Sequence, residues 1–389
     1  MPADRTAVVV LLAPALDTVP FGPTDTRAPE PYGLAATGSR YAASTVAVGV
    51  GGVSDPLAEA AAGSFTRSAI EPWPWEARLM HRLGLLASGA DLQSVSGALP
   101  VAELLGPDDL AVAPSEGDAL VIADPVSLSP GRDEATLTPS ESLGLTAAEG
   151  NALLAAANGL LAEDGITLSR GVSGRWYLRG LDAEGLGTPP AHFLARREVG
   201  HHLPASSAAA PWRCLMTELQ MLWHAHPVNE ARLERGAPPV NGLWFWGGAS
   251  PPDVPSTAPR TTVVADEPFA RSLARHVGAG FSDHRPFDEA LAAAGSGEHA
   301  DTGDTLLVLE LDPYAAWLAN DADALEVARE RALERWLAPA ARAVVDGRAA
   351  SLVVIGGDRH EARFSAPFLR SRLARLFGPR AARLFGGSR

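Results

Sequence analysis

Short valine- and leucine-rich runs, each followed by a helical stretch, restrict the fold of this chain more than any other feature. Uninterrupted apolar runs of this length are typical of strands buried on both faces. The repeated order of strand, loop and helix predicts an α/β fold: a doubly wound, mostly parallel sheet with helices on both faces. The predicted strands are Val8–Leu12, Thr45–Val50, Thr261–Asp266, Thr305–Leu311 and Ser351–Ile355, and the helices after the last three are Pro268–Val277, Ala322–Val345 and Pro367–Phe377.

Acidic residues follow several of these predicted strands. They are Asp17, Asp266, Asp312 and Asp358. Ligands of open α/β sheets bind beyond the carboxyl ends of the strands, so an aspartate there is placed for a functional site. An aspartate at this position also caps the helix that follows it. Both interpretations remain open.

The middle of the chain has a different pattern. Thr146 and Glu149 form a capping-box sequence, which predicts a helix from there to about Leu161. A hairpin follows, with short strands at 166–168 and 175–179 around a glycine turn. We therefore predict a small α+β lid at residues 136–190, inserted into a discontinuous core of residues 1–135 and 191–389.

Composition excludes several classes of function. All 32 basic residues among the 389 are arginine, so no lysine can form a Schiff base or complete a P-loop. The single cysteine, Cys214, excludes disulfide frameworks and multi-cysteine metal sites. A net charge of −14 argues against nucleic-acid partners. Because no apolar run approaches the length of a membrane span, we expect a cytoplasmic protein without a membrane partner.

Residues 212–248 are the densest in chemically informative side chains. A predicted helix at 212–223 is followed by His224 and His226. The two histidines either bind a metal as a pair, or His226 caps the helix through a main-chain hydrogen bond. Trp244 and Trp246 fall on one face of a predicted strand, where they either pack in the core or stack against a substrate.

Two further features are compatible with charged ligands or partners. The forked donors of Arg175, Arg179 and Arg232 suit a carboxylate or phosphate, although surface salt bridges use the same groups. The segment 362–389 is rich in arginine and has no acidic residue. It either neutralises the acidic body, docks a partner, or attaches weakly to a nucleic acid or membrane.

The motif His226-Pro-Val-Asn229, followed by Arg232, Asn241 and Leu243-Trp-Phe-Trp-Gly247, resembles a segment of the archaeal-type cofactor-independent phosphoglycerate mutases. Gly171-Val-Ser-Gly-Arg175 resembles a turn in that family's lid. The resemblance implies an alkaline-phosphatase-like core with an inserted lid. The residues that we expect to bind a ligand are Arg175, His226, Asn229, Arg232, Asn241, Trp244 and Trp246.

Bacterial RpfE-type regulatory proteins resemble the chain more closely, over roughly residues 115–250. The motifs that carry this resemblance are Ala123-Asp-Pro-Val126, Leu143-Gly-Leu-Thr146, Arg175-Trp-Tyr-Leu178, His202-Leu-Pro204 and Glu218-Leu-Gln-Met-Leu222.

The chain departs from the mutase pattern where the chemistry is expected. The superfamily's enzymes hold two metal ions with aspartates and histidines, and a serine or threonine carries the phosphoryl group. Here Leu12-Ala13-Pro14 replaces the usual Asp-Gly, and no nucleophile motif surrounds Ser44, Ser54 or Ser64. The remaining candidate metal ligands are Asp17, Asp312, Asp358 and His360.

These departures favour a mutase-like protein with a degenerate site that has a regulatory or binding role. We expect no cofactor, and either an unknown protein partner or a small phosphorylated ligand. The alternative is an active metal-dependent mutase or phosphatase that uses Mn or Zn at the four candidate ligands.

Overall fold

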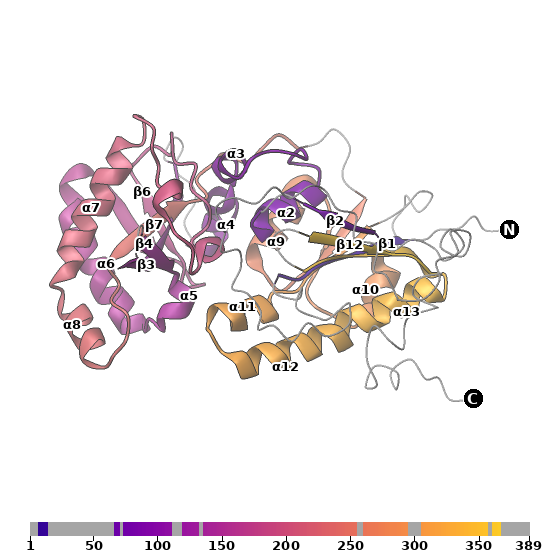
Figure 1. Cartoon of the computed structure of the whole chain (residues 1–389). Coiled ribbons are helices and arrows are strands. Elements are labelled where there is room, and N and C mark those ends of the chain that lie inside the picture. Colours follow the sequence, from indigo (N-terminus) through magenta and orange to yellow (C-terminus); the bar gives the residue numbers. More distant parts are fainter. Residues whose placement is uncertain are drawn as a thin grey trace, which may run out of the picture.

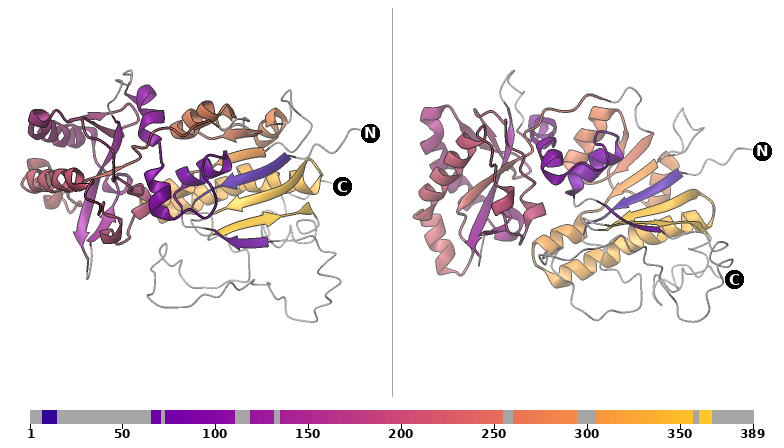
Figure 2. Two further views of the ribbon diagram at one scale, coloured as in Figure 1. Left: turned by 90° about the horizontal axis from the view of Figure 1, so that it is seen from above. Right: turned by 45° about the horizontal axis from the view of Figure 1, so that its top comes forward.

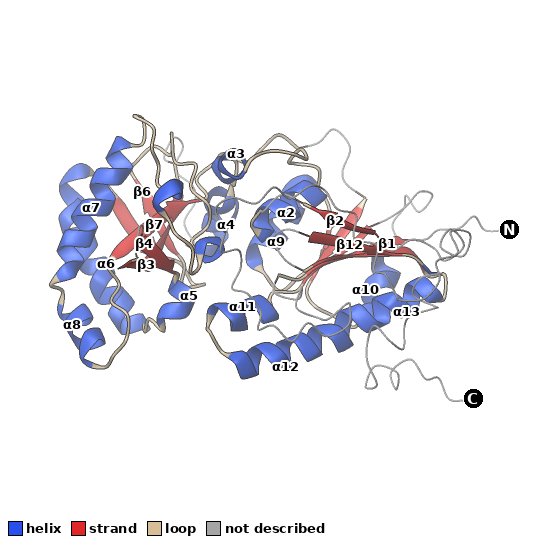
Figure 3. Cartoon of the chain, in the orientation of Figure 1, coloured by secondary structure: helices blue, strands red, loops and turns tan. Residues whose placement is uncertain are grey.

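The computed structural model describes residues 7–14, 66–70, 73–110, 119–131, 135–254, 260–294, 305–356 and 360–366. Two β-sheets with their covering helices lie side by side (Figure 1). Helices and strands alternate in one of these parts, and a compact antiparallel sheet forms the centre of the other (Figure 3). The fold is therefore mixed α/β, as the sequence predicts.

The larger sheet is mostly parallel. Its order among the described residues is β2-β12-β11-β1-β10-β8-β9. Strands β11, β1, β10, β8 and β9 run parallel, and β12 and β2 pair antiparallel at one edge. The bounds are β1 Ala7–Leu12, β2 Thr66–Ala69, β8 Thr261–Val264, β9 Gly280–Ser282, β10 Thr305–Leu309, β11 Ala349–Ile355 and β12 His360–Phe364.

Helices cover both faces of this sheet because its central strands are apolar on both sides. In β1, Val10 and Leu12 pack toward α2, α9 and α11, whereas Val9 and Leu11 pack toward α10 and α13. Figure 2 shows the two helical layers. The bounds are α2 Trp75–Arg82, α3 Leu92–Gly97, α4 Val101–Asp109, α9 Pro268–Val277, α10 Phe287–Ala294, α11 Asp312–Leu318, α12 Ala322–Ala332 and α13 Ala338–Val345, with a π turn at Leu333–Leu337.

The predicted strands of this sheet lie within two residues of the observed ones wherever the structure describes them. The predicted helix Pro268–Val277 coincides with α9, and the predicted Ala322–Val345 comprises α12, the π turn and α13. The predicted strand Thr45–Val50 and helix Pro367–Phe377 lie outside the described residues.

The second sheet is antiparallel and has helices on its outer face. Its order is β4-β3-β6-β5, with β7 paired to β3. We call this sheet and helices α5–α8 the antiparallel module. The bounds are β3 Val121–Pro130, β4 Ala135–Thr138, β5 Thr167–Arg170, β6 Trp176–Arg179, β7 Gly242–Trp246, α5 Ser140–Leu143, α6 Ala147–Leu161, α7 Ala210–His224 and α8 Pro227–Glu234, with short 3-10 turns at Ala162–Asp164, His192–Leu194 and Gly200–His202.

The antiparallel module is larger than the lid predicted at residues 136–190. Strands β3 and β7, which the prediction assigned to the core, pair with each other from Ile122–Trp246 to Val126–Gly242. The predicted borders came from local turn and breaker residues, whereas the module as defined here follows long-range strand pairing. The division into a lid and a discontinuous core stays a prediction. All strands of the module come between β2 and β8 in the chain, so the module is one continuous insertion.

The predicted capping box starts α6 and also holds a buried arginine. Thr146 accepts a hydrogen bond from the Glu149 amide, and Glu149 accepts one from the Thr146 amide. Burial opposes the charge of Glu149, but these bonds and its arginine partners lower its pKa to about 2. Arg232, which is fully buried, contacts the same carboxylate at 3.2 Å and donates to the carbonyls of Pro238 and Leu143. Arg232 therefore joins α6, α8 and the end of α5.

This arrangement gives a matched pair of variants. We expect Arg232→Met to lower the free energy of unfolding by about 3 kcal/mol, because it leaves buried carbonyls without a donor. Arg235 binds the same Glu149 from the surface, so Arg235→Met should cost about 1 kcal/mol or less. Urea unfolding of both variants measures this difference, and equal losses would contradict it.

Candidate functional site

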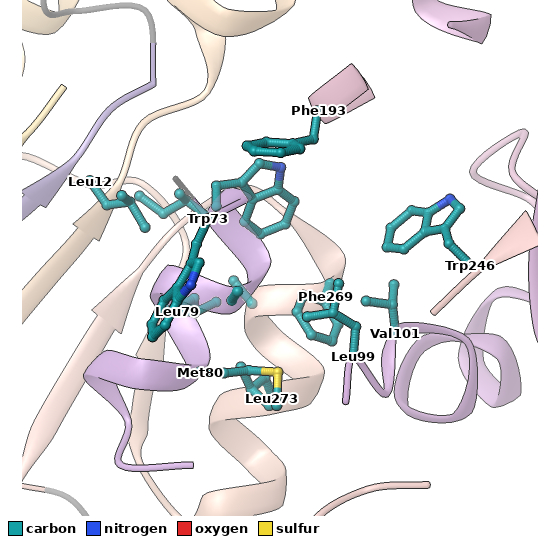
Figure 4. Packing of buried hydrophobic residues seen from close by; sticks show 14 of the residues in the cluster. Leu12, Trp73, Leu79, Met80, Leu99, Val101, Phe193, Trp246, Phe269 and Leu273 are labelled. Atoms are coloured by element: carbon teal, nitrogen blue, oxygen red, sulfur yellow. The ribbon is translucent and has the colours of Figure 1, made fainter. Parts of the chain in front are cut away.

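The inner face of the antiparallel module packs against the larger sheet's helices along a surface that we call the seam. Alternation along β3 directs Ile122, Asp124 and Val126 toward this seam. Figure 4 shows Trp246 of β7 near Leu99, Val101 and Phe269 in the same apolar cluster. Asp124 is 8% exposed and accepts a hydrogen bond from Trp246 Nε1 at 2.6 Å. A carboxylate is thus buried in an otherwise apolar contact.

A second buried carboxylate, that of Glu76, and the imidazole of His192 also lie at the seam. Glu76 of α2 is buried, and its Oε1 lies 2.8 Å from His192 Nε2. Tyr314 Oη donates to the His192 carbonyl and lies 3.1 Å from His192 Nδ1. Both ring nitrogens of His192 thus have polar partners, Glu76 at Nε2 and Tyr314 at Nδ1. Burial opposes a positive charge on the ring, but Glu76 raises the pKa of His192 above its usual value.

A tight turn fixes Arg175 at the seam. Asp109 accepts hydrogen bonds from the Ser173 amide, the Ser173 hydroxyl and Tyr177 Oη, at 2.7, 2.7 and 2.8 Å. A Cβ at Gly171 would lie 2.0 Å from the Asp109 carboxylate, so this position of the turn requires glycine. The turn starts β6, whose alternation places Arg175 and Tyr177 on the seam side.

The guanidinium of Arg175 lies 5.7 Å from the centre of the Trp246 ring. It is half-buried and makes no direct hydrogen bond or ion pair with the described residues. Burial disfavours its charge, but Asp124 and Glu267 raise its pKa. Arg175 is therefore held by charge and ring contact, and its donors are uncommitted within the described part of the chain.

We call Glu76, Asp124, Arg175, His192 and Glu267 the charge cluster. Burial raises the pKa of Asp124 to about 6, against the opposing effect of Arg175. Burial likewise raises the pKa of Glu267, the N-cap of α9. Glu76 Oε2 is buried without a hydrogen-bond partner among the described residues. The cluster thus brings three carboxylates and two cations together at the seam.

A pocket opens next to the charge cluster, at the carboxyl end of β1. Its cavity is small, about 30 Å³, and it opens to the surface. Trp75 connects the two features, because its ring stacks near His192 and also lines the pocket. We call it the aromatic pocket, lined by Leu12, Pro14, Trp73, Pro74, Trp75, Arg78, Phe193, Arg197, Tyr314 and Trp317.

Arginines lie over the rings of this pocket. Arg78 is 5.2 Å from the Trp73 ring centre, and Arg197 is 4.4 Å from that of Phe193. At the rim, Arg196 lies over Trp317 and donates to Asn320 Oδ1 at 3.0 Å. Arg196 and Asn320 are the two non-glycine residues with positive φ in the described ranges. Backbone strain of this kind costs about 1–3 kcal/mol per residue and concentrates at functional sites.

A second hollow lies between α3 and the loop at 183–187. Glycines, small side chains and main chain form most of its wall, and Glu184 is the charged residue among those lining it. At about 420 Å³ it is the larger of the two, but it has little chemistry with which to select a ligand. The aromatic pocket has the more selective side chains.

Several residues expected to bind a ligand instead bind main chain inside the antiparallel module. Asn229 donates to the carbonyls of Trp223 and Val240 and accepts from the Val240 amide. Asn241 exchanges two hydrogen bonds with Leu128. With Arg232, described above, these side chains join the strands and helices of the module.

Of the other residues that we expected to bind a ligand, His226 caps a helix, and Arg175, Trp244 and Trp246 lie at the seam. His226 Nδ1 accepts a hydrogen bond from the Val228 amide, so it caps the start of α8 rather than the end of α7. Trp244 and Trp246 share one face of β7, as predicted, and Trp244 Nε1 donates to the Pro189 carbonyl. The structure thus brings Trp244, Trp246 and Arg175 to the seam and leaves His226, Asn229, Arg232 and Asn241 elsewhere.

The candidate metal ligands are described only in part. Asp312 is exposed at the first position of α11. Asp17, Asp358 and the His360 side chain lie outside the described residues. Among described side chains, no three His, Cys, Asp or Glu residues gather as metal ligands. The described lining of the aromatic pocket has no carboxylate or imidazole, so these residues do not fit a pair of divalent cations.

Sequence reasoning missed most of the charge cluster and the pocket. Asp124 had a usable signal, because an aspartate inside the apolar run 121–126 needs a buried partner. Glu76, His192 and Arg197 had none, since only the packing of the two sheets brings them together.

The described part of the chain contains no helix that is long and apolar enough to cross a bilayer.

Comparisons with known proteins point to the phosphoglycerate mutases. The chain is 27% identical over 154 residues, 39% of each chain, to a probable 2,3-bisphosphoglycerate-independent phosphoglycerate mutase of Geobacter sulfurreducens. It is 26% identical over 110 residues, 28% of each chain, to such a mutase of Methanosarcina barkeri. A third, of Methanothrix thermoacetophila, is 34% identical over 68 residues, 18% of this chain and 17% of that one. The chain thus spans about two fifths or less of these relatives, and no family model matches it.

Solved structures overlay loosely on the chain. The PH0037 protein from Pyrococcus horikoshii has a TM-score of 0.38 and 12% identity, over 93% of this chain and 87% of that one. The cofactor-independent phosphoglycerate mutase from Thermoplasma acidophilum has a TM-score of 0.30 and 15% identity, over 96% and 99%. The sequence similarity to these relatives supports a phosphoglycerate-mutase-like protein.

The raised pKa of Asp124 predicts a pH-dependent stability. The pKa of Asp124 rises from 3.8 to about 6 on folding, so the folded state binds the proton more tightly than the unfolded state. The resulting contribution to the free energy of unfolding is complete below about pH 4 and is lost as the pH rises past 6. The difference in free energy of unfolding between Asp124→Asn and the wild type should therefore be about 3 kcal/mol more favourable to the variant at pH 8 than at pH 4. Denaturant unfolding across this range tests it, with exposed Asp164→Asn as the control. A difference that does not change with pH would contradict the prediction.

Proposed function

We propose that this chain is a phosphoglycerate-mutase-like protein with a degenerate catalytic site, which binds a small phosphorylated ligand in the aromatic pocket and acts in regulation. The observation that carries the proposal is the described wall of that pocket, where rings and arginines stand in place of carboxylates. A wall of this composition attracts an anion and offers no ligands to divalent cations.

The position of the pocket supports a binding role. It opens at the carboxyl end of β1, next to the start of α11, which follows β10. Ligands of parallel α/β sheets bind at this edge. Arg78 and Arg197 lie in the pocket wall and supply positive charge. Their forked donors suit phosphate oxygens.

The charge cluster supports the proposal from the adjoining seam. Arg175 faces Asp124, Glu76 and Glu267, and its charge offsets theirs. Without it, the negative field of three carboxylates would repel an anion in the neighbouring pocket. This gives Arg175, which the sequence singled out, a part in binding without direct contact.

The architecture and the motif resemblance agree with this proposal. A mostly parallel sheet interrupted by one continuous antiparallel insertion is what an alkaline-phosphatase-like core with a lid requires. The RpfE-type resemblance includes Ala123–Val126 and Arg175–Leu178, which contribute Asp124 and Arg175 to the charge cluster. A regulatory role is the function that this resemblance implies.

Titration calorimetry with 3-phosphoglycerate tests the binding role. We expect the full-length protein to bind it, and Arg197→Gln to weaken binding about tenfold through loss of a charge-assisted contact. Arg175→Gln should also weaken binding, by about threefold, because it leaves the carboxylates unbalanced. Arg271→Gln is the matched control, since Arg271 also lies over a ring, that of Phe281, away from the pocket.

Unchanged affinity in Arg197→Gln, with melting temperatures preserved, would refute the pocket as the binding site. The same protein should not interconvert 2- and 3-phosphoglycerate above background with added Mn²⁺ or Zn²⁺.

One observation favours the active enzyme as a second candidate. Asp17, Asp312 and Asp358 follow β1, β10 and β11, which are neighbours in the sheet. Carboxyl ends of adjacent parallel strands converge at one edge, so these residues remain candidate ligands for Mn or Zn together with His360. Mutase activity that is lost in Asp358→Ala and His360→Ala would establish this alternative.

A further inference from the structure

The outermost strand of the antiparallel module is closed by a side chain instead of another strand. Strand β5 ends the order β4-β3-β6-β5 of the described residues, with β6 as its neighbour. Leu168 of β5 pairs with Leu178 of β6. The Leu168 amide nevertheless donates to Asn158 Oδ1, and the Leu168 carbonyl accepts from Asn158 Nδ2, both at 2.8 Å. Both main-chain groups of Leu168 therefore face away from β6, as in the non-hydrogen-bonded pairs of an antiparallel ladder.

The opposite end of the sheet, at β4, is closed by main chain. The Leu137 amide donates to the Arg197 carbonyl, and the Leu137 carbonyl accepts from the Arg196 amide. The Ala135 carbonyl accepts from the Val199 amide. A run of main chain thus covers several groups of β4 in succession, whereas the outward groups of β5 at Leu168 depend on the one side chain of Asn158.

The helix that carries Asn158 has no need of an asparagine. Leu153, Ala157 and Leu161 of α6 are fully buried against the sheet, so the position after Ala157 is turned about 100° to the side of that face. Asparagine is a weaker helix former than the alanines at 155–157 that precede it. The two hydrogen bonds to Leu168 therefore account for Asn158.

The β5 edge lies at the surface and is complementary to a second copy of itself. Thr167 and Arg170 are exposed, and uncovered edge strands associate with other strands. A two-fold axis at Leu168 would let two copies exchange both outward main-chain hydrogen bonds. It would place Thr167 opposite Ser169 of the other copy, with no like charges directly opposite each other.

We propose that Asn158 closes the β5 edge and so prevents two copies of this chain from pairing through it. The side chain occupies the amide and the carbonyl of Leu168 that a second β5 strand would use. This role is independent of the proposed binding function, since it concerns the outermost strand of the module and not the aromatic pocket.

Replacement of Asn158 tests the proposal by light scattering and sedimentation of the full-length protein over a range of concentrations. Asn158→Ala should open the edge, and we expect a species of twice the wild-type mass, with self-association at least about tenfold tighter than in the wild type. Asn151→Ala is the matched control, because Asn151 is exposed on the same helix. This control should keep the wild-type mass.

An aspartate variant separates strand pairing from a general loss of stability. In Asn158→Asp the carboxylate accepts from the Leu168 amide but has no proton to donate to the Leu168 carbonyl, so this variant also loses a contact. Its charge at the edge opposes the addition of a strand. We therefore expect Asn158→Asp to keep the wild-type mass.

Hydrogen exchange of the Leu168 amide locates the contact. In dilute Asn158→Ala the amide should exchange faster than in the wild type, because its acceptor is gone. As the concentration rises, its exchange should slow again, because the second copy supplies a new acceptor.

Three outcomes would each overturn the proposal. They are a wild-type mass for folded Asn158→Ala at every concentration, equal association of the alanine and aspartate variants, and association that leaves the Leu168 amide unprotected. Melting temperatures show which variants are folded. If Asn158→Ala does not fold, Asn158→Ser gives the same comparison, because its side chain is too short to bridge both groups of Leu168.

Discussion

The ion pair between His192 and Glu76 is the contact on which the seam depends. It joins α2, which covers the parallel sheet, to the segment between β6 and α7 of the antiparallel module, and both partners are buried. Removing one member of such a pair costs several kcal/mol, because the other charge remains without compensation. Tyr314, at the start of α11, binds the same histidine. The His192 ring therefore links α2, α11 and the inserted module, which also supply walls of the aromatic pocket.

Charge at the carboxyl edge of the sheet is arranged differently from what the mutase resemblance implies. A dimetal centre needs carboxylates in its wall, and the described wall presents arginines and rings. The carboxylates of the region, Glu76, Asp124 and Glu267, lie deeper at the seam, where Arg175 and His192 compensate them. These three carboxylates are therefore compensated within the seam.

Local sequence patterns predicted the elements well and their assembly less well. The capping box of Thr146, helix α9 and the hairpin around Gly171–Gly174 all follow from short-range rules, because each depends on residues within one or two turns. The extent of the module does not, because β3 and β7 are paired across more than a hundred residues. The site shows the same limit: Arg175 was identified by its chemistry, whereas Glu76 and His192 acquire meaning only when the two sheets pack together.

Arg196 and Asn320 meet at the mouth of the pocket although they are far apart in the chain, and each holds a left-handed backbone conformation. Arg196 belongs to the inserted module, between β6 and α7, and Asn320 follows α11. The entrance is thus completed only when the insertion is docked on the sheet. By mass action, any molecule that occupies the entrance must favour the docked arrangement over one in which the two parts separate.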